Sequence, residues 1–145
     1  MEIKIINNQK HIPIKIKQRE DQAVKILNGL GCDNAELSIV LVDDDEISRL
    51  NLAYLDRKGP TNVMSFPMNE GPFNELNPEM LGDVVISVET AARDAEKGGY
   101  TLDEMLDFYL VHGILHLLGY GHEDSADRAA EMDARSRNIW NMLGH

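Results

Sequence analysis

Three histidines lie close together in the stretch HGILHLLGYGH, which spans residues 112–122. His112 and His116 are four residues apart, so on a helix their imidazole rings project from the same face, one turn apart. Gly119 is the residue type that ends a helix in the left-handed conformation and reverses the chain, which returns His122 toward the pair. Zinc binds imidazole nitrogens at about 2.0–2.1 Å, and three such ligands leave a fourth position open. The stretch therefore predicts a catalytic zinc (Zn²⁺) site with the ligands His112, His116 and His122.

A structural explanation of the same residues has to be weighed, because an isolated histidine is more often a hydrogen-bonded core residue than a metal ligand. Three of the five histidines of the chain fall in this one stretch, with a glycine where the helix should turn. That combination favours the metal site. His11 and His145 stand alone in the sequence, and we predict no role for them.

The spacing is similar to the H-E-x-x-H-x-x-G-x-x-H pattern of the metzincin zinc peptidases. In those enzymes a glutamate beside the first histidine is the general base, and this chain has Gly113 there. A metallopeptidase is therefore the weaker alternative for this site.

The first two histidines should lie on a helix over residues 101–118. Thr101 followed by Glu104 is the pattern of a capping box, in which each residue satisfies the other's backbone N–H at the start of a helix. Apolar residues at helical spacing should hold this helix in the core: Leu102, Leu106, Tyr109, Leu110, Ile114 and Leu117.

The remaining elements are predicted from alternation, helical periodicity and turn residues. We expect strands at 2–6 and 36–42, and two short strands within 59–67 and 81–89. Helices are expected from near Pro13 to Leu30, from Asp43 or Asp44 to Tyr54, and over 89–97 and 125–143. The order βαβαββααα predicts an α/β (α+β) fold in a single domain, 1–145. A small mixed four-stranded sheet is flanked by helices, one of them a zincin-like helix that carries the histidines.

Length and composition are those of an ordinary globular domain, with 145 residues, 43% hydrophobic and 27% charged. No apolar run approaches the ~20 residues that cross a membrane, and the start of the chain lacks the apolar region of a signal peptide. Cys32 is the single cysteine, which excludes a thiolate zinc cluster and an internal disulfide. We expect a cytoplasmic protein.

The net charge of −11 argues against broad, charge-driven binding to nucleic acid. Acidic residues concentrate at 43–46 and after His122. Basic residues concentrate in KHIPIKIKQR (10–19) and DRK (56–58), which are the expected approaches for a polyanion.

The histidine stretch resembles the H-G-x-L-H-x-x-G-Y-D-H motif of the YbeY family, bacterial single-strand-specific endoribonucleases that mature ribosomal RNA. The segment LNLAYLDRKGPTNVMSFP (50–67) is similar to that family's L-N-x-x-Y-R followed by P-T-[DN]-V-L-S-F-P, and LGDVVIS (81–87) is similar to its L-G-D-[IL]-x-I. The resemblance covers nearly the whole chain. It implies a zinc-dependent endoribonuclease whose partners are single-stranded RNA, ribosomal RNA and components of the small ribosomal subunit. We expect neither DNA nor a membrane as a partner.

The chain departs from that family's pattern at two positions. Gly121 stands where the motif has aspartate, and Glu123 or Asp124 would have to compensate. Leu55 stands where the arginine after the tyrosine belongs, and we expect Arg57, two residues on, to take its place.

We therefore expect Arg57 and His112 to act in catalysis, with Arg57 clamping a phosphate of the substrate. Thr61, Asn62 and Ser65 are candidates for orienting the RNA backbone, although they are also ordinary strand residues. Asp83 is a candidate general base with an equally plausible structural role. The loss at Leu55 keeps open the alternative of a non-catalytic, metal-stabilised ribosome-assembly factor.

Overall fold

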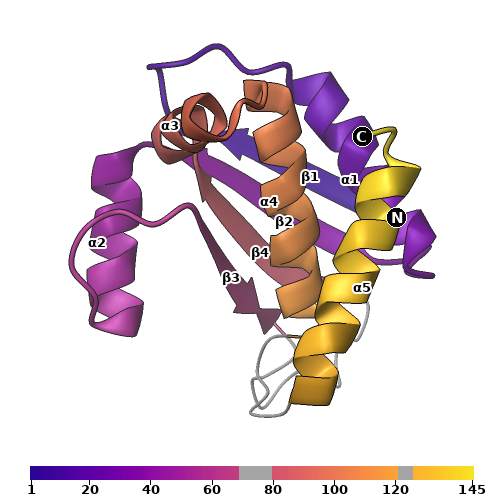
Figure 1. Ribbon diagram of the computed structural model, residues 1–145. Coiled ribbons are helices and arrows are strands. Elements are labelled where there is room, and N and C mark those ends of the chain that lie inside the picture. Colours follow the sequence, from indigo (N-terminus) through magenta and orange to yellow (C-terminus); the bar gives the residue numbers. More distant parts are fainter. Residues whose placement is uncertain (69–79, 121–125) are drawn as a thin grey trace.

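A computed structural model describes residues 1–68, 80–120 and 126–145, with side chains in the last segment described from residue 129. The strands are β1 (Glu2–Asn7), β2 (Glu36–Val42), β3 (Val63–Pro67) and β4 (Met80–Ser87). The helices are α1 (Ile16–Gly29), α2 (Asp44–Leu55), α3 (Val88–Gly98), α4 (Leu102–Leu117) and α5 (Ala126–Met142). The predicted order βαβαββααα and the α+β class are confirmed (Figure 1).

The strands form one four-stranded mixed sheet in the order β1-β2-β4-β3. Strand β2 pairs in parallel with β1 and β4, whereas β3 runs antiparallel along the edge of β4. Central strands that are covered on both faces need nearly continuous apolar runs, which is what ELSIVLV in β2 and DVVI in β4 provide.

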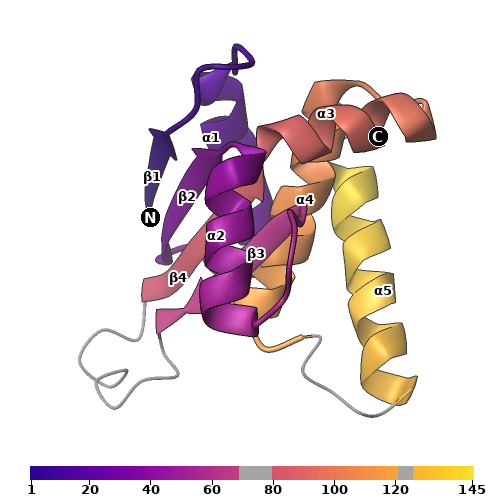
Figure 2. The same cartoon turned by 90° about the vertical axis from the view of Figure 1, so that its left-hand side faces the viewer.

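Helices cover both faces of the sheet (Figures 1 and 2). Helices α1 and α4 close the larger core, which includes Ile26, Ile39, Val84, Leu110 and Ile114. Helix α2 closes a smaller core on the other face, which contains Val42, Ile47, Met64 and Val85. Successive side chains of β4 therefore point to opposite faces of the sheet, with Val84 toward α4 and Val85 toward α2.

The start of α1 differs from the prediction. The helix begins at Ile16, three residues after Pro13, and its N-cap Lys15 makes no side-chain capping bond. The other predicted N-cap is confirmed, because the Asp43 carboxylate accepts a hydrogen bond of 2.9 Å from the Glu46 backbone N–H at the start of α2. Among the described helices, none is both long and apolar enough to cross a membrane.

Three cations of the basic stretch 10–19 lie beside acidic side chains. Arg19 is buried and forms an ion pair with the buried Asp107 of α4. Lys15 lies 3.7 Å from a carboxylate oxygen of Asp103, and Lys17 lies 3.3 Å from one of Asp21. These cations are used to hold α1 in place or are balanced by nearby acids.

Candidate metal centre

Helix α4 has well-defined ends, and these fix the position of its histidines. At its start the Thr101 hydroxyl accepts a hydrogen bond from the Glu104 backbone N–H (3.1 Å), and the Glu104 carboxylate accepts one from the Thr101 N–H (2.9 Å). The predicted capping box is therefore confirmed. At its end Gly119 has φ +99°, and the N–H groups of Gly119 and Tyr120 donate to the carbonyls of His116 (3.0 Å) and Leu115 (3.1 Å). This is a Schellman motif, and it reverses the chain where the sequence predicted.

His112 and His116 converge on one point. Their Nε2 atoms lie 2.9 Å apart, and the ring planes are inclined by 71° with centroids 4.5 Å apart. Two nitrogens that bind one tetrahedral zinc ion at about 2.0–2.1 Å are themselves about 3.3 Å apart, so the pair needs little movement to share an ion. Burial lowers the pKa of His112 below its ordinary value, which favours the neutral imidazole that binds metals.

The third predicted ligand, His122, lies outside the described residues, as do Gly121, Glu123 and Asp124. The chain is described up to Tyr120, just past the reversal at Gly119. The third ligand, three residues beyond the reversal at Gly119, therefore stays a prediction, and its sequence position is compatible with a return toward the pair.

Gly113 has a packing role that the sequence did not reveal. A Cβ atom at this position would lie 2.7 Å from Cγ1 of Val84 and 3.3 Å from Cγ2 of Val63. Both are β-branched core residues of the sheet, so α4 approaches the strands so closely that only glycine fits. A Cβ atom at position 113 would be pressed against the sheet.

A cleft of about 820 Å³ opens beside the two histidines and is lined by the end of α2, the loop after it and β3. His112, His116, Arg57 and Lys58 all line this cleft. The structure thus brings the predicted cation Arg57 and two of the three predicted ligands, His112 and His116, to one cavity. Leu55 lines the same cleft, with its side chain 52% exposed.

The loop that carries Arg57 is held by Asn51, the asparagine of the segment LNLAY (50–54). Asp56 ends α2 in the left-handed conformation (φ 52°), and the Arg57 N–H donates to the Asn51 carbonyl at 3.3 Å. The buried Asn51 side chain also donates to the Gly59 carbonyl at 3.0 Å. The sequence signal for this support is the asparagine of the family's L-N-x-x-Y-R pattern, which the chain keeps at Asn51.

The polar residues of β3 are partly committed to structure. The Ser65 hydroxyl donates to the Gly113 carbonyl at 2.9 Å and so joins β3 to α4. The Asn62 side chain accepts from the Val63 N–H at 2.7 Å. Thr61, Asn62 and Ser65 still line the cleft. Asp83 is not among the residues that line the cleft, so nothing in the structure supports it as a base at this site; it alternates with Val84 along β4 and faces the α2 side of the sheet.

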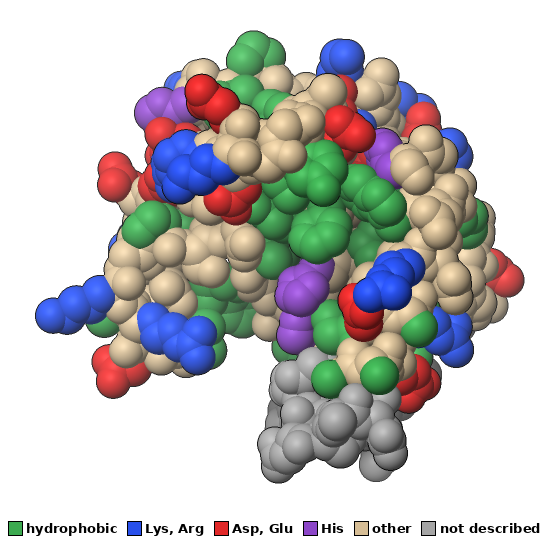
Figure 3. Space-filling view, in the orientation of Figure 1, with side chains coloured by type: hydrophobic (Ala, Val, Ile, Leu, Met, Phe, Trp, Pro, Cys, Tyr) green, Lys and Arg blue, Asp and Glu red, His purple; other side chains and the backbone are tan. Residues whose placement is uncertain are grey.

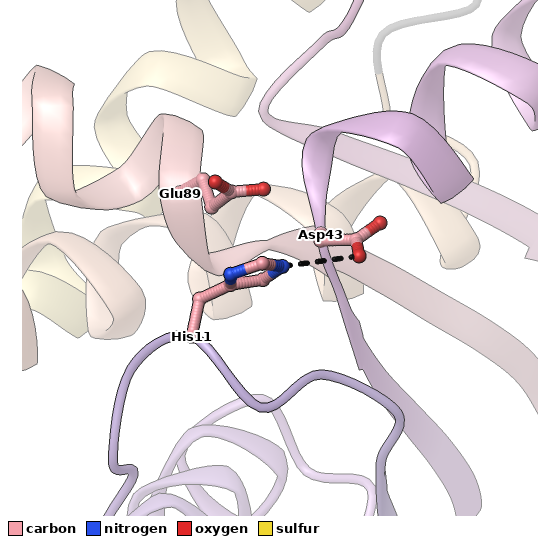
Figure 4. A group of neighbouring side chains, drawn as sticks. All are labelled: His11, Asp43 and Glu89. Atoms are coloured by element: carbon pink, nitrogen blue, oxygen red, sulfur yellow. Dashed lines mark ion pairs between the residues drawn. The ribbon is translucent and has the colours of Figure 1, made fainter.

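A different group of ligand-type side chains, His11, Asp43 and Glu89, lies at the starts of α2 and α3 (Figure 4). His11 pairs with Asp43 at 3.4 Å. The two carboxylates already accept backbone hydrogen bonds of 2.9 Å, Asp43 from Glu46 and Glu89 from Asp44. Helix N-termini attract anions and repel cations, so the group is explained by helix capping, and we assign no metal to it.

A model of the family described as endoribonuclease YbeY matches residues 4–144. The chain belongs to the endoribonuclease YbeY family. The endoribonuclease YbeY of Geobacter metallireducens is 47% identical over 144 residues, which cover 99% of this chain and 96% of that protein. The YbeY of Syntrophus aciditrophicus is 43% identical, over 99% of this chain and 90% of that protein.

The fold agrees with a solution structure of TM1509 from Thermotoga maritima, with a TM-score of 0.67. The likeness covers 97% of this chain and 88% of that chain, at 23% sequence identity, and it concerns the fold alone.

Proposed function

We propose that residues 1–145 act as one zinc-dependent endoribonuclease domain that cleaves single-stranded RNA during ribosomal RNA maturation in the cytoplasm. Its zinc ligands are His112, His116 and His122. The observation that carries the proposal is the pair of Nε2 atoms 2.9 Å apart in the wall of a cleft that also holds Arg57 and Lys58. Membership of the endoribonuclease YbeY family supports it independently.

When bound, zinc supplies Lewis acidity toward a phosphate oxygen and lowers the pKa of water to around 7. His112 and His116 serve as neutral ligands, and the burial of His112 keeps its ring in that form near pH 7. The planar guanidinium of Arg57 donates two parallel hydrogen bonds to the phosphate and stabilises the negative charge that grows during cleavage. Lys58 adds a second positive charge at the same wall of the cleft.

The substrate that fits these groups is a flexible polyanion. Two cations on one loop and a pair of metal-binding histidines line the same cleft, which suits one phosphodiester and the phosphates beside it. A single strand can bend to place a phosphodiester there. Ribosomal RNA is the natural source of such strands, and components of the small ribosomal subunit are the partners that would present them.

The decisive experiment measures cleavage of a single-stranded RNA oligonucleotide by the pure protein, with and without a zinc chelator, alongside metal analysis. We expect cleavage that stops on chelation and returns when zinc is added. Casein is the control substrate and should stay intact, because Gly113 has no side chain to act as the base of a peptidase mechanism. Chelator-sensitive casein hydrolysis without RNA cleavage would overturn the proposal.

The second candidate function is a metal-stabilised ribosome-assembly factor without catalytic activity. The observation that favours it is Leu55, which presents an apolar side chain to the cleft where the family motif has arginine. Stoichiometric zinc in the pure protein together with intact RNA would support this candidate over the nuclease.

A further inference from the structure

A second hollow adjoins the histidines on the side of α5. It has a volume of about 520 Å³ and lies between α4 and α5, and His112 lines it as well as the cleft described above. Its floor is apolar and aromatic, formed by Phe108, Met132 and Trp140. Hydrophobic side chains face solvent beside histidine in the view of Figure 3. Phe108 is 45% exposed, and together with Met132 and Trp140 it forms a contiguous apolar surface in this hollow.

The aromatic floor is held rigidly. The rings of Phe108 and Trp140 meet edge to face with centroids 5.8 Å apart, and the Trp140 ring stacks on the His145 ring with centroids 4.2 Å apart. The His145 ring is fixed in turn, because its Nε2 lies 3.0 Å from a carboxylate oxygen of the buried Asp107. A platform that is already ordered loses little entropy when a planar group stacks on it.

The rim of this hollow is polar. Asp133, Ser136 and Arg137 line it along one side of α5, and the Arg137 guanidinium pairs with Asp133 at 2.6 Å. The hollow therefore offers apolar surface to the faces of a ligand and hydrogen-bonding groups to its edge. A flat ring system with polar edges is the chemistry that matches, and in RNA that is the nucleobase.

The position of the hollow indicates which base of the RNA would bind there. His112 separates the basic cleft with Arg57 and Lys58 from the aromatic hollow. A strand with a phosphate at the histidines has its neighbouring base within reach on the α5 side. We propose that Phe108 and Trp140 bind the nucleobase adjacent to the cleaved phosphodiester, so that this pocket selects unpaired RNA. The inference rests on the proposed endoribonuclease function and assigns the subsite that reads the single strand.

Trp140 is the single tryptophan of the chain, so its fluorescence reports on this pocket directly. The zinc-loaded protein is titrated with AMP, and in parallel with ribose 5-phosphate, which has the same phosphate and sugar but no base. We expect AMP to quench Trp140 fluorescence with saturation and ribose 5-phosphate to leave it unchanged. Equal responses to both, or no response to AMP, would overturn the proposal.

Kinetics with single-stranded RNA test the role in the substrate complex. Phe108→Ala should raise KM about tenfold, the usual loss for one stacked base, with kcat unchanged. Phe108→Tyr keeps the ring and should keep the wild-type KM. Tyr100→Ala is the matched control, because Tyr100 is an exposed aromatic residue that does not line the pocket.

The outcomes separate this inference from the proposed function. RNA cleavage by Phe108→Ala with the wild-type KM overturns the base subsite and leaves the nuclease standing. If AMP quenches Trp140 fluorescence, ribose 5-phosphate does not, and the protein leaves RNA intact, the nuclease is overturned and the base subsite is supported. If Phe108→Ala fails to fold, as judged by circular dichroism, Phe108→Tyr and the AMP titration of the wild type still decide the question.

Discussion

His112 occupies the wall between two hollows, and its environment suits a metal ligand. Its Nε2 lies 2.9 Å from that of His116, and burial favours its neutral form. A zinc site of three histidines loses most of its affinity when one ligand is removed. We therefore expect His112→Ala, His116→Ala and His122→Ala each to bind much less than one zinc per chain, measured by metal analysis after gel filtration.

His11→Ala is the matched control for these variants, because His11 belongs to the capping group at the starts of α2 and α3. It should retain the zinc content of the wild type. Full zinc in all three ligand variants would show that the metal is bound elsewhere.

Arg57 is the residue whose role the sequence left most open, since the family arginine falls at Leu55. Its place in the cleft beside the histidines supports a phosphate clamp. Losing such a charge-assisted contact costs on the order of 3 kcal/mol in the transition state, about a hundredfold in rate. Arg57→Ala should therefore lower kcat for RNA cleavage about a hundredfold. Arg57→Lys should recover only part of that rate, because lysine keeps the positive charge but cannot donate two parallel hydrogen bonds to the phosphate.

Arg49→Ala is the control for Arg57, since Arg49 is an exposed arginine on α2 that pairs with Glu46 and does not line the cleft. Leu55→Arg, which restores the family pattern, should keep or raise the rate. A zinc-loaded Arg57→Ala enzyme that cleaves at the wild-type rate would rule out the clamp.

At the scale of elements, Asp44 joins the start of α2 to α3. Its carboxylate accepts hydrogen bonds from the hydroxyls of Ser87 and Thr90 and from the Arg93 guanidinium, each at 2.7 Å. Burial by itself would raise the pKa of Asp44, but these donors outweigh it and hold the pKa below the ordinary value of 3.8. A lowered carboxyl pKa stabilises the fold above pH 3.8, and that stabilisation is lost as the pH falls through the lowered value.

We therefore expect Asp44→Ala to lower the free energy of unfolding by about 1–2 kcal/mol at neutral pH. The difference from wild type should stay constant above the ordinary carboxyl pKa and shrink in stronger acid. Urea titrations followed by circular dichroism at several pH values measure it. Asp45→Ala, the exposed neighbour in the same first turn, should have little effect. A difference that grows on acidification would refute this account.

Local patterns predicted the elements well, because caps and periodicity act within a few residues. The Thr101 box and the Gly119 reversal were both readable in this way. The contacts that join distant elements could not be predicted from the sequence in this way. The ion pair between Arg19 and Asp107 spans 88 positions, and nothing in a basic stretch marks one of its residues as buried. The face on which Asp83 points was equally hidden, since both faces of β4 are apolar.

At the scale of the whole molecule, a protein with net charge −11 must bind RNA through a small positive region. Arg57 and Lys58 line the cleft, whereas Lys17 is balanced by Asp21. Two phosphate contacts to a single strand give a slope of about −1.4 for log affinity against log salt. We expect that slope for single-stranded RNA, measured by fluorescence anisotropy between about 50 and 200 mM salt.

The double variant Arg57→Ala/Lys58→Ala should flatten the salt dependence, and Lys17→Ala should leave it as in the wild type. An unchanged slope in the double variant would mean that other cations contact the RNA.

The close approach of α4 to the sheet at Gly113 also bears on how such enzymes diverge. A single nucleotide change can turn a glycine codon into a glutamate codon, which would complete the peptidase pattern H-E-x-x-H. Here the new side chain would be driven against Val84 and Val63 in the core. The first effect of that mutation would be on folding, so selection for proteolysis would have nothing to act on.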